Sequence, residues 1–134
     1  MSTIRVRVPQ FTKWFEGNPR LMLWWYTIVY YQHTDIVKND PNPTVDTYTI
    51  LMTEYLERTI NEVLDSGDLS SSPLYKDILD YRENIVPMTE LYIKEIFNHM
   101  ELLRANRVKP YEPRTFQSSV GAAYDGEYIR LEQL

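Results

Sequence analysis

The longest apolar stretch of the chain lies near the amino terminus, from Leu21 to Tyr31, where only Thr27 is neither apolar nor aromatic. Asn18 and Pro19 precede it. This pair is typical of a helix start, because asparagine caps the first turn and proline suits its first position. The pattern therefore predicts a helix over residues 19–37. Such a helix is apolar around most of its circumference, so we expect the other elements to cover it on most sides.

Two further segments show apolar residues at spacings of three and four, which is typical of amphipathic helices. The first covers residues 45–64 and follows a capping Thr44. The second covers residues 73–106, but Pro87 interrupts it, so it is either one kinked helix or two helices that meet near Pro87. The sequence thus predicts a mainly α fold, a compact four-helix bundle around the buried aromatic helix 19–37.

The first residues of the chain alternate between apolar and charged side chains. Ile4 and Val6 fall on one side, and Arg5 and Arg7 fall on the other. A period of two predicts a short N-terminal strand, which Pro9 ends. The backbone groups of a strand need a partner strand, so we treat these four residues as candidate contact residues.

The last part of the chain, residues 107–134, loses the helical pattern. Asp125-Gly126 is a strong signal for a two-residue hairpin turn. The segment is therefore either a small β-hairpin, which the N-terminal strand could join, or an extended tail that becomes ordered on a partner. We divide the chain into a helical domain, residues 1–106, and this C-terminal tail. The candidate partner-binding residues of the tail are Tyr111, Phe116, Tyr124, Tyr128, Ile129 and Leu131.

The composition places the chain among globular proteins of one domain, with 134 residues and no cysteine. The apolar stretch at residues 21–31 is shorter than the roughly 20 residues that a membrane-spanning helix needs. The amino terminus lacks the apolar region of a classical signal peptide. We therefore expect a soluble protein without a membrane partner, located in the cytoplasm or within a virus particle.

The net charge of −5 is unevenly distributed along the chain. Residues 1–34 have a net charge of +3, residues 35–95 hold thirteen acidic and five basic residues, and residues 96–134 are neutral. Phosphate neutralisation dominates nucleic-acid binding, so the acidic middle argues against a nucleic-acid partner. The eleven tyrosines favour contact with other proteins, because tyrosine is enriched at interfaces.

The chain holds few residues suited to catalysis or metal binding. His99 follows Glu95 by four residues, a spacing that could hold a metal, but no third ligand accompanies them. His33 falls near the end of the first helix, where the helix dipole alone favours histidine. With four glycines there is neither a phosphate-binding loop nor a nucleophile elbow. We predict no enzyme activity, no catalytic residue, no metal site and no cofactor.

These observations favour a non-enzymatic protein-interaction or assembly module that uses its termini for contacts, as a homo-oligomer or in a larger assembly. In composition, though in no motif, the chain resembles small proteins of tailed bacteriophages. That likeness implies a virion component such as a head–tail adaptor or a cement-like protein.

Two alternatives remain open. One is an acidic inhibitor or regulator of a host enzyme that mimics nucleic acid through its acidic helices. Its residues would be Asp46, Glu54, Glu57, Glu62, Asp65, Asp77, Asp80 and Glu83. The other is a small-ligand or enzymatic site in the helical core, which would be lined by Trp24, Trp25, Tyr30 and His33.

Overall fold

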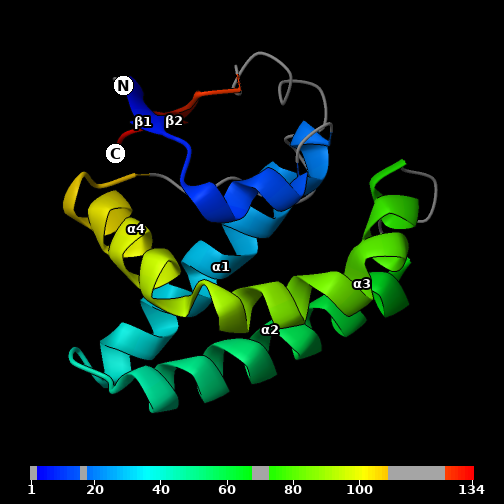
Figure 1. Ribbon diagram of the computed structural model, residues 1–134, viewed down its shortest axis with the longest axis horizontal. Helices are drawn as coiled ribbons and strands as arrows, with labels where there is room; N and C mark the ends of the chain where they lie inside the picture. The colour runs from blue at the N-terminus through cyan, green and yellow to red at the C-terminus, as the bar shows by residue number, and fades with distance from the viewer. Residues whose placement is uncertain (1–2, 16–17, 68–72, 109–125) are drawn as a thin grey trace.

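The computed structural model describes residues 3–15, 18–67, 73–108 and 126–134. It is mainly helical, and a two-stranded sheet joins the two ends of the chain (Figure 1). In chain order the elements are β1 (Thr3–Arg7), the 3-10 helix η1 (Gln10–Phe15), α1 (Pro19–Asn39), α2 (Val45–Ser66), α3 (Pro73–Leu91), α4 (Ile93–Ala105) and β2 (Tyr128–Glu132).

The first long helix, α1, lies at the centre of the molecule. It contacts α2, α3, α4 and η1. Among the side chains that the structure describes between Leu21 and Tyr30, none is more than 8% exposed, and Trp24 and Trp25 are fully buried. The predicted buried aromatic helix is therefore confirmed, and it extends to Asn39.

The ends of the first two helices follow the local signals of the sequence. The side-chain oxygen of Asn18 accepts a hydrogen bond from the Leu21 amide at 3.1 Å. In the same way, Thr44 accepts one from the Thr47 amide at 3.1 Å. Gly67 ends α2 with a φ of 77°, a conformation that glycine adopts without a steric penalty. Capping residues thus determine where α1 and α2 begin and where α2 ends.

The region between residues 73 and 105 forms two helices, but the break falls at Tyr92. The two helices therefore do not meet near Pro87, because α3 continues through this residue to Leu91. A proline inside a helix lowers the stability of that helix by about 3 kcal/mol. Tertiary packing opposes this cost, because α3 packs along α2. The next helix, α4, also buries Ile93 and Ile96. Packing over whole helices, rather than the local preference of one residue, determines where the chain turns.

The strands β1 and β2 pair antiparallel, with Val6 opposite Ile129 and Ile4 opposite Leu131. Val6, Ile129 and Leu131 are buried in the same apolar cluster as the side chains of α1. The amide of Val8 extends the pairing by donating to the Glu127 carbonyl at 2.8 Å. The ends of the chain are therefore part of one core with the helices.

Part of the predicted C-terminal hairpin lies outside the described residues. Its second strand, over residues 127–131, corresponds to β2. The first strand, over residues 120–124, falls outside, and so do Tyr111, Phe116 and Tyr124. The division of the chain after residue 106 stays a prediction.

None of the helices described here combines the length and the apolar character that crossing a bilayer requires.

Candidate functional site

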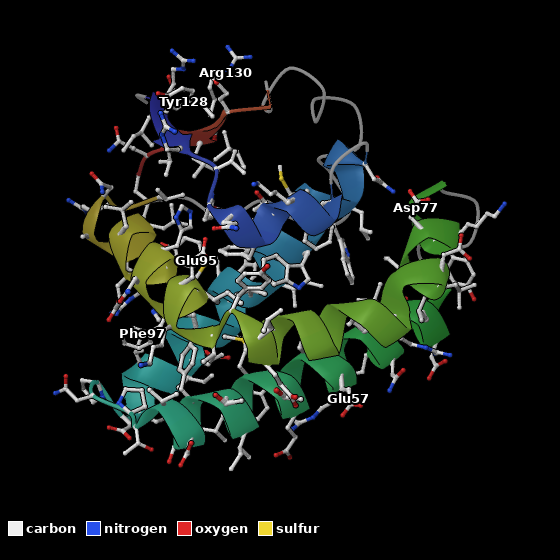
Figure 2. The ribbon with its side chains drawn as sticks, viewed as in Figure 1. Glu57, Asp77, Glu95, Phe97, Tyr128 and Arg130 are labelled. Atoms are coloured by element: carbon white, nitrogen blue, oxygen red, sulfur yellow. The ribbon has the colours of Figure 1, made fainter. Side chains whose placement is uncertain are left out.

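The outer face of the β1–β2 ribbon gathers basic side chains. Because side chains alternate along a strand, Arg5 and Arg7 of β1 share this face with Arg130 and Tyr128 of β2, opposite the buried face. The exposed Glu132 of β2 lies on the same face, opposite Thr3. The guanidinium carbon of Arg5 lies 4.6 Å from the centre of the Tyr128 ring, and that of Arg7 lies 5.6 Å from it. Both distances suit cation–π contacts, which hold the charges close together. We call Arg5, Arg7, Tyr128 and Arg130 the arginine face, of which Figure 2 labels Tyr128 and Arg130.

The candidate contact residues of the two strands lie on two different faces of the ribbon, one exposed and one buried. Arg5 and Arg7 are exposed, and Tyr128 is half-buried. Val6, Ile129 and Leu131 are buried, and Ile4 packs against the same core. The arginine face is therefore the solvent-facing side of the ribbon, while the apolar residues hold the ribbon on the helices.

The helical side of the molecule is acidic. Most of the carboxylates described on α2 and α3 are exposed, and Figure 2 labels two of the acidic residues, Glu57 and Asp77, on these helices. The exposed ones are Asp46, Glu54, Glu57, Glu62, Asp65, Asp80 and Glu90, with Asp77 half-buried and the side chain of Glu83 outside the described ones. Arginines thus predominate on the outer face of the ribbon, which also carries Glu132, whereas carboxylates predominate on α2 and α3.

A polar groove of about 400 Å³ lies between α1 and α2. We call it the α1–α2 groove, and it is lined by Gln32, Asp35, Asn39, Tyr55, Arg58, Thr59 and Glu62. A guanidinium nitrogen of Arg58 lies 3.6 Å from a carboxylate oxygen of Glu54, which is not part of the groove lining. The guanidinium carbon of Arg58 lies 5.0 Å from the centre of the Tyr55 ring. Asp35 and Glu62 are the carboxylates of the lining, so the groove suits a cationic, hydrogen-bonding group.

Beneath the surface, His33 joins three helices. The Tyr48 hydroxyl of α2 donates to its Nδ1 at 2.6 Å, and Nε2 lies 3.3 Å from the carboxylate of Glu101 on α4. Arg104 donates to the same carboxylate oxygen at 2.7 Å. In a neutral imidazole with its proton on Nε2, Nδ1 accepts the hydrogen bond from Tyr48, while Nε2 faces the Glu101 carboxylate without the geometry of a hydrogen bond. His33 is fully buried, unlike a histidine held only by the dipole at a helix end.

Burial controls the protonation of this group of side chains. It lowers the pKa of His33 below its ordinary value, although the Glu101 carboxylate partly opposes the effect. Burial also raises the pKa of Tyr48. Burial would raise the pKa of Glu101 too, but the contacts with His33 and Arg104 outweigh it and keep the pKa low. Tyr48 is therefore a neutral hydrogen-bond donor, and it positions His33 in the core.

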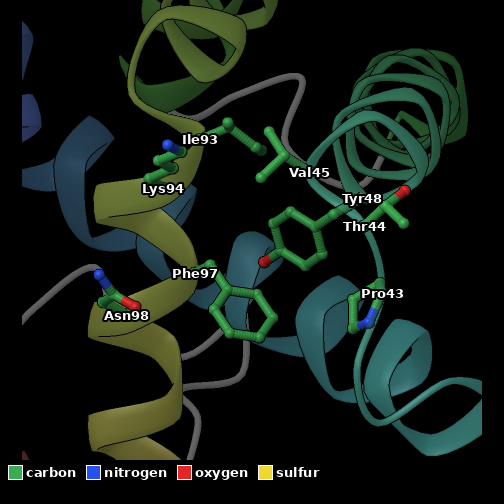
Figure 3. Close-up of a pocket in the computed structure, with 8 residues that line it drawn as sticks. All are labelled: Pro43, Thr44, Val45, Tyr48, Ile93, Lys94, Phe97 and Asn98. Carbon is green, nitrogen blue, oxygen red and sulfur yellow. The ribbon is translucent and has the colours of Figure 1, made fainter.

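An apolar pocket of about 260 Å³ opens between the first turns of α2 and α4 (Figure 3). We call it the α2–α4 pocket. It is lined by Pro43, Thr44, Val45, Tyr48, Ile93, Lys94, Phe97 and Asn98. The rings of Tyr48 and Phe97 meet edge to face, with centroids 5.0 Å apart, and both also contact the His33 ring. The buried histidine thus supports two rings that line the pocket.

The second histidine, His99, is buried between Phe11 and Tyr26, more deeply than a position at a helix edge. Burial lowers its pKa to about 4, so its imidazole is neutral. The Glu95 carboxylate instead accepts a hydrogen bond from the Phe11 amide at 3.3 Å. In the described part of the chain, no three metal-binding side chains come together.

The side chains that were candidates for a core ligand site, Trp24, Trp25, Tyr30 and His33, are buried. They line neither the α1–α2 groove nor the α2–α4 pocket. The residues that do form the pocket carry no motif. Tyr48 and Phe97 each belong to an ordinary apolar helix stripe, and only the packing of α2 against α4 brings them together.

Compared with known proteins, the chain matches no protein-family model, no curated protein and no solved structure.

Proposed function

We propose that the protein is a non-enzymatic assembly module that associates with a second copy of itself through the arginine face. The observation that supports this proposal is the separation of charge. A cluster of guanidinium groups lies on the ribbon beside the exposed Glu132, while most of the exposed carboxylates that the structure describes lie on the helices. Complementary charges accelerate the encounter of two proteins and fix their relative orientation.

The α1–α2 groove is the proposed docking site for the arginine face of the second copy. Its carboxylates, Asp35 and Glu62, can pair with guanidinium groups, and the amides of Gln32 and Asn39 can complete the hydrogen bonds. Figure 1 shows the ribbon at the top of the view and α2 along the bottom, which favours contact between copies over contact within one chain.

This association joins two different surfaces, so it is heterologous, and it leads to a ring or an open chain of subunits. Such growth suits a structural component of a larger assembly. A virion component, such as a head–tail adaptor or a cement-like protein, is the more specific form of the proposal. In this form of the proposal, the four long helices act as a compact bundle that supports the ribbon.

The experiment is analytical ultracentrifugation of the full chain at low and high salt. We expect association at low salt that weakens as salt is added, because exposed charges are screened beyond about 8 Å at physiological ionic strength. Replacement of Arg5 and Arg7 by glutamate should abolish association. Lys13→Glu, on η1, is the matched control, because Lys13 is exposed but lies outside the arginine face. A wild-type protein that stays monomeric at low salt would refute the proposal.

A second candidate is an acidic inhibitor or regulator that mimics nucleic acid. The exposed carboxylates of α2 and α3 favour it. Its partner would be a basic nucleic-acid-binding protein, and the arginine face would not be needed. Binding to such a protein that survives the Arg5→Glu and Arg7→Glu changes, but disappears when Glu57 and Asp80 become lysine, would favour this candidate.

A further inference from the structure

The α2–α4 pocket has no role in the proposed association, yet it has the size and lining of a small-molecule site. Its volume is about 260 Å³. For comparison, an apolar protein cavity of about 150 Å³ is large enough to bind benzene. The α2–α4 pocket therefore has room for one aromatic ring or a short aliphatic chain with a polar group attached.

The rings that line this pocket are already held in place without a ligand. Tyr48 and Phe97 lie at an interplanar angle of 85°. The Tyr48 hydroxyl is fixed by His33, which in turn faces the Glu101 carboxylate. A ligand that binds to such a preformed surface does not have to order the side chains, so more of its contact energy appears as affinity.

The charges around the pocket favour an anion. Lys94 is the charged residue of its lining, and it is exposed to solvent. The long helix α2 also begins here, at Val45, and the N-terminal end of a helix carries a partial positive charge. The start of α4 at Ile93 adds little to it, because α3 ends at Leu91 and its C-terminal end carries the opposite partial charge. Tyr92, at the start of α4, adds no side-chain cap to that helix.

Two nearby acidic side chains could oppose an anion. Asp46 belongs to the first turn of α2 and is exposed, but it is not part of the pocket lining. The Glu95 carboxylate accepts a hydrogen bond from the Phe11 amide of η1, so it too is engaged outside the pocket. The charge that lines the pocket is therefore that of Lys94.

From this geometry we propose that the α2–α4 pocket binds a small amphipathic carboxylate. The apolar ring or chain of the ligand packs on Tyr48 and Phe97, and its carboxylate lies at Lys94. This site is independent of the arginine face and of the α1–α2 groove.

The test is a titration of the full chain with phenylpropionate, followed by NMR. We expect chemical-shift changes that saturate and that are concentrated at Val45, Tyr48 and Phe97. Phenylpropylamine has the same ring and the opposite charge, and it should bind more weakly. The proposal would be overturned if the amine bound as tightly as the carboxylate, if phenylpropionate did not saturate, or if the changes lay elsewhere.

Two variants locate the site. Lys94→Met keeps the aliphatic stem and removes the charge, so it should weaken phenylpropionate roughly two- to fivefold, the range expected for an exposed ion pair. Lys76→Met, on α3, is the matched control, because Lys76 is exposed and lies outside the pocket lining. Equal affinities of these two variants would contradict a carboxylate at Lys94.

Val45→Trp tests the pocket itself. Val45 is 47% exposed, so a larger side chain can be placed there without overpacking the core, and it should fill the pocket and abolish binding. A thermal melt of this variant verifies that it is folded. The Arg5→Glu and Arg7→Glu protein should still bind phenylpropionate, so a failure of the proposed self-association leaves this test unaffected. Undiminished binding by a folded Val45→Trp protein would overturn the proposal.

Discussion

At the scale of single residues, the buried histidines control how the fold responds to pH. His33 receives a hydrogen bond from Tyr48 and faces the carboxylate of Glu101. The Nε2 atom of His99 is buried without a hydrogen-bond partner in the described structure, and the rings of Phe11 and Tyr26 lie against it. His33 is therefore hydrogen-bonded to a neighbouring helix through Nδ1, although its Nε2, like that of His99, is buried without a hydrogen-bond partner among the described residues.

The first prediction concerns His99. Its pKa falls from 6.5 to about 4 on folding, so the unfolded chain binds the proton more tightly. Stability is therefore complete above pH 6.5 and decreases as the pH falls toward 4, by an amount on the order of 2 kcal/mol at pH 5. His99→Leu should make the loss of stability at low pH smaller. Part of the loss should remain, because folding also lowers the pKa of His33. Urea unfolding at several pH values measures both, and an unchanged pH dependence in the variant would contradict the assignment.

The second prediction concerns the hydroxyl of Tyr48. Tyr48→Phe keeps the ring but leaves Nδ1 of the buried His33 without its donor, so it should lower the free energy of unfolding by about 1–3 kcal/mol. Tyr55→Phe is the matched control, because Tyr55 lies on the same helix and is only half-buried. Denaturant unfolding compares the two variants. Equal stabilities would show that the Tyr48–His33 hydrogen bond contributes little.

At the scale of elements, α3 places a proline inside a helix. Pro87 lies between Pro73 and Leu91, the ends of α3, and proline removes one backbone donor there. The third prediction is that Pro87→Ala raises the free energy of unfolding by about 1–3 kcal/mol, because the helical backbone is already present at this position. Thermal unfolding measures the change. A lower melting temperature would mean that the proline shapes the break at Tyr92.

The strands provide the fourth prediction. Ile129 of β2 is fully buried, so Ile129→Ala should lower the free energy of unfolding by about 2–4 kcal/mol. Arg130→Ala, at the next residue and on the outer face, should change it by less than about 1 kcal/mol. Calorimetry of both variants measures the difference. Similar effects would contradict the observed alternation of faces.

Much of the fold could be predicted from local patterns. The apolar run at Leu21–Tyr31 indicated a buried helix, and the capping residues Asn18 and Thr44 placed the starts of α1 and α2. The alternation near the amino terminus indicated β1. Each of these features depends on residues close together in the sequence, so the sequence alone contains the necessary information.

The features that could not be predicted depend on contacts between distant segments. The break at Tyr92 results from how α3 and α4 pack, and Pro87 pointed to a different position. His33, Tyr48 and Glu101 come from three helices, and no spacing in the sequence relates them. The α2–α4 pocket could not be found for the same reason, because its walls belong to two helices that only tertiary packing brings together.

At the scale of the whole molecule, the distribution of charge is the feature that the proposed function depends on. The chain has a net charge of −5, and yet the ribbon carries Arg5, Arg7 and Arg130 on a single face. The α1–α2 groove offers Asp35 and Glu62 to a partner. Opposite charges on separate surfaces of one molecule favour head-to-tail association.

The most direct test of this account is to mix two variants that cannot associate alone and to measure the product by sedimentation velocity. One variant carries Arg5→Glu and Arg7→Glu, and the other carries Asp35→Asn and Glu62→Gln, which remove the groove charges without making the two altered surfaces complementary to each other. Each keeps one intact surface, so we predict that each is monomeric alone and that the mixture forms a one-to-one dimer that grows no further. A mixture that remains monomeric, or variants that associate alone as the wild type does, would contradict the proposed contact between the arginine face and the α1–α2 groove.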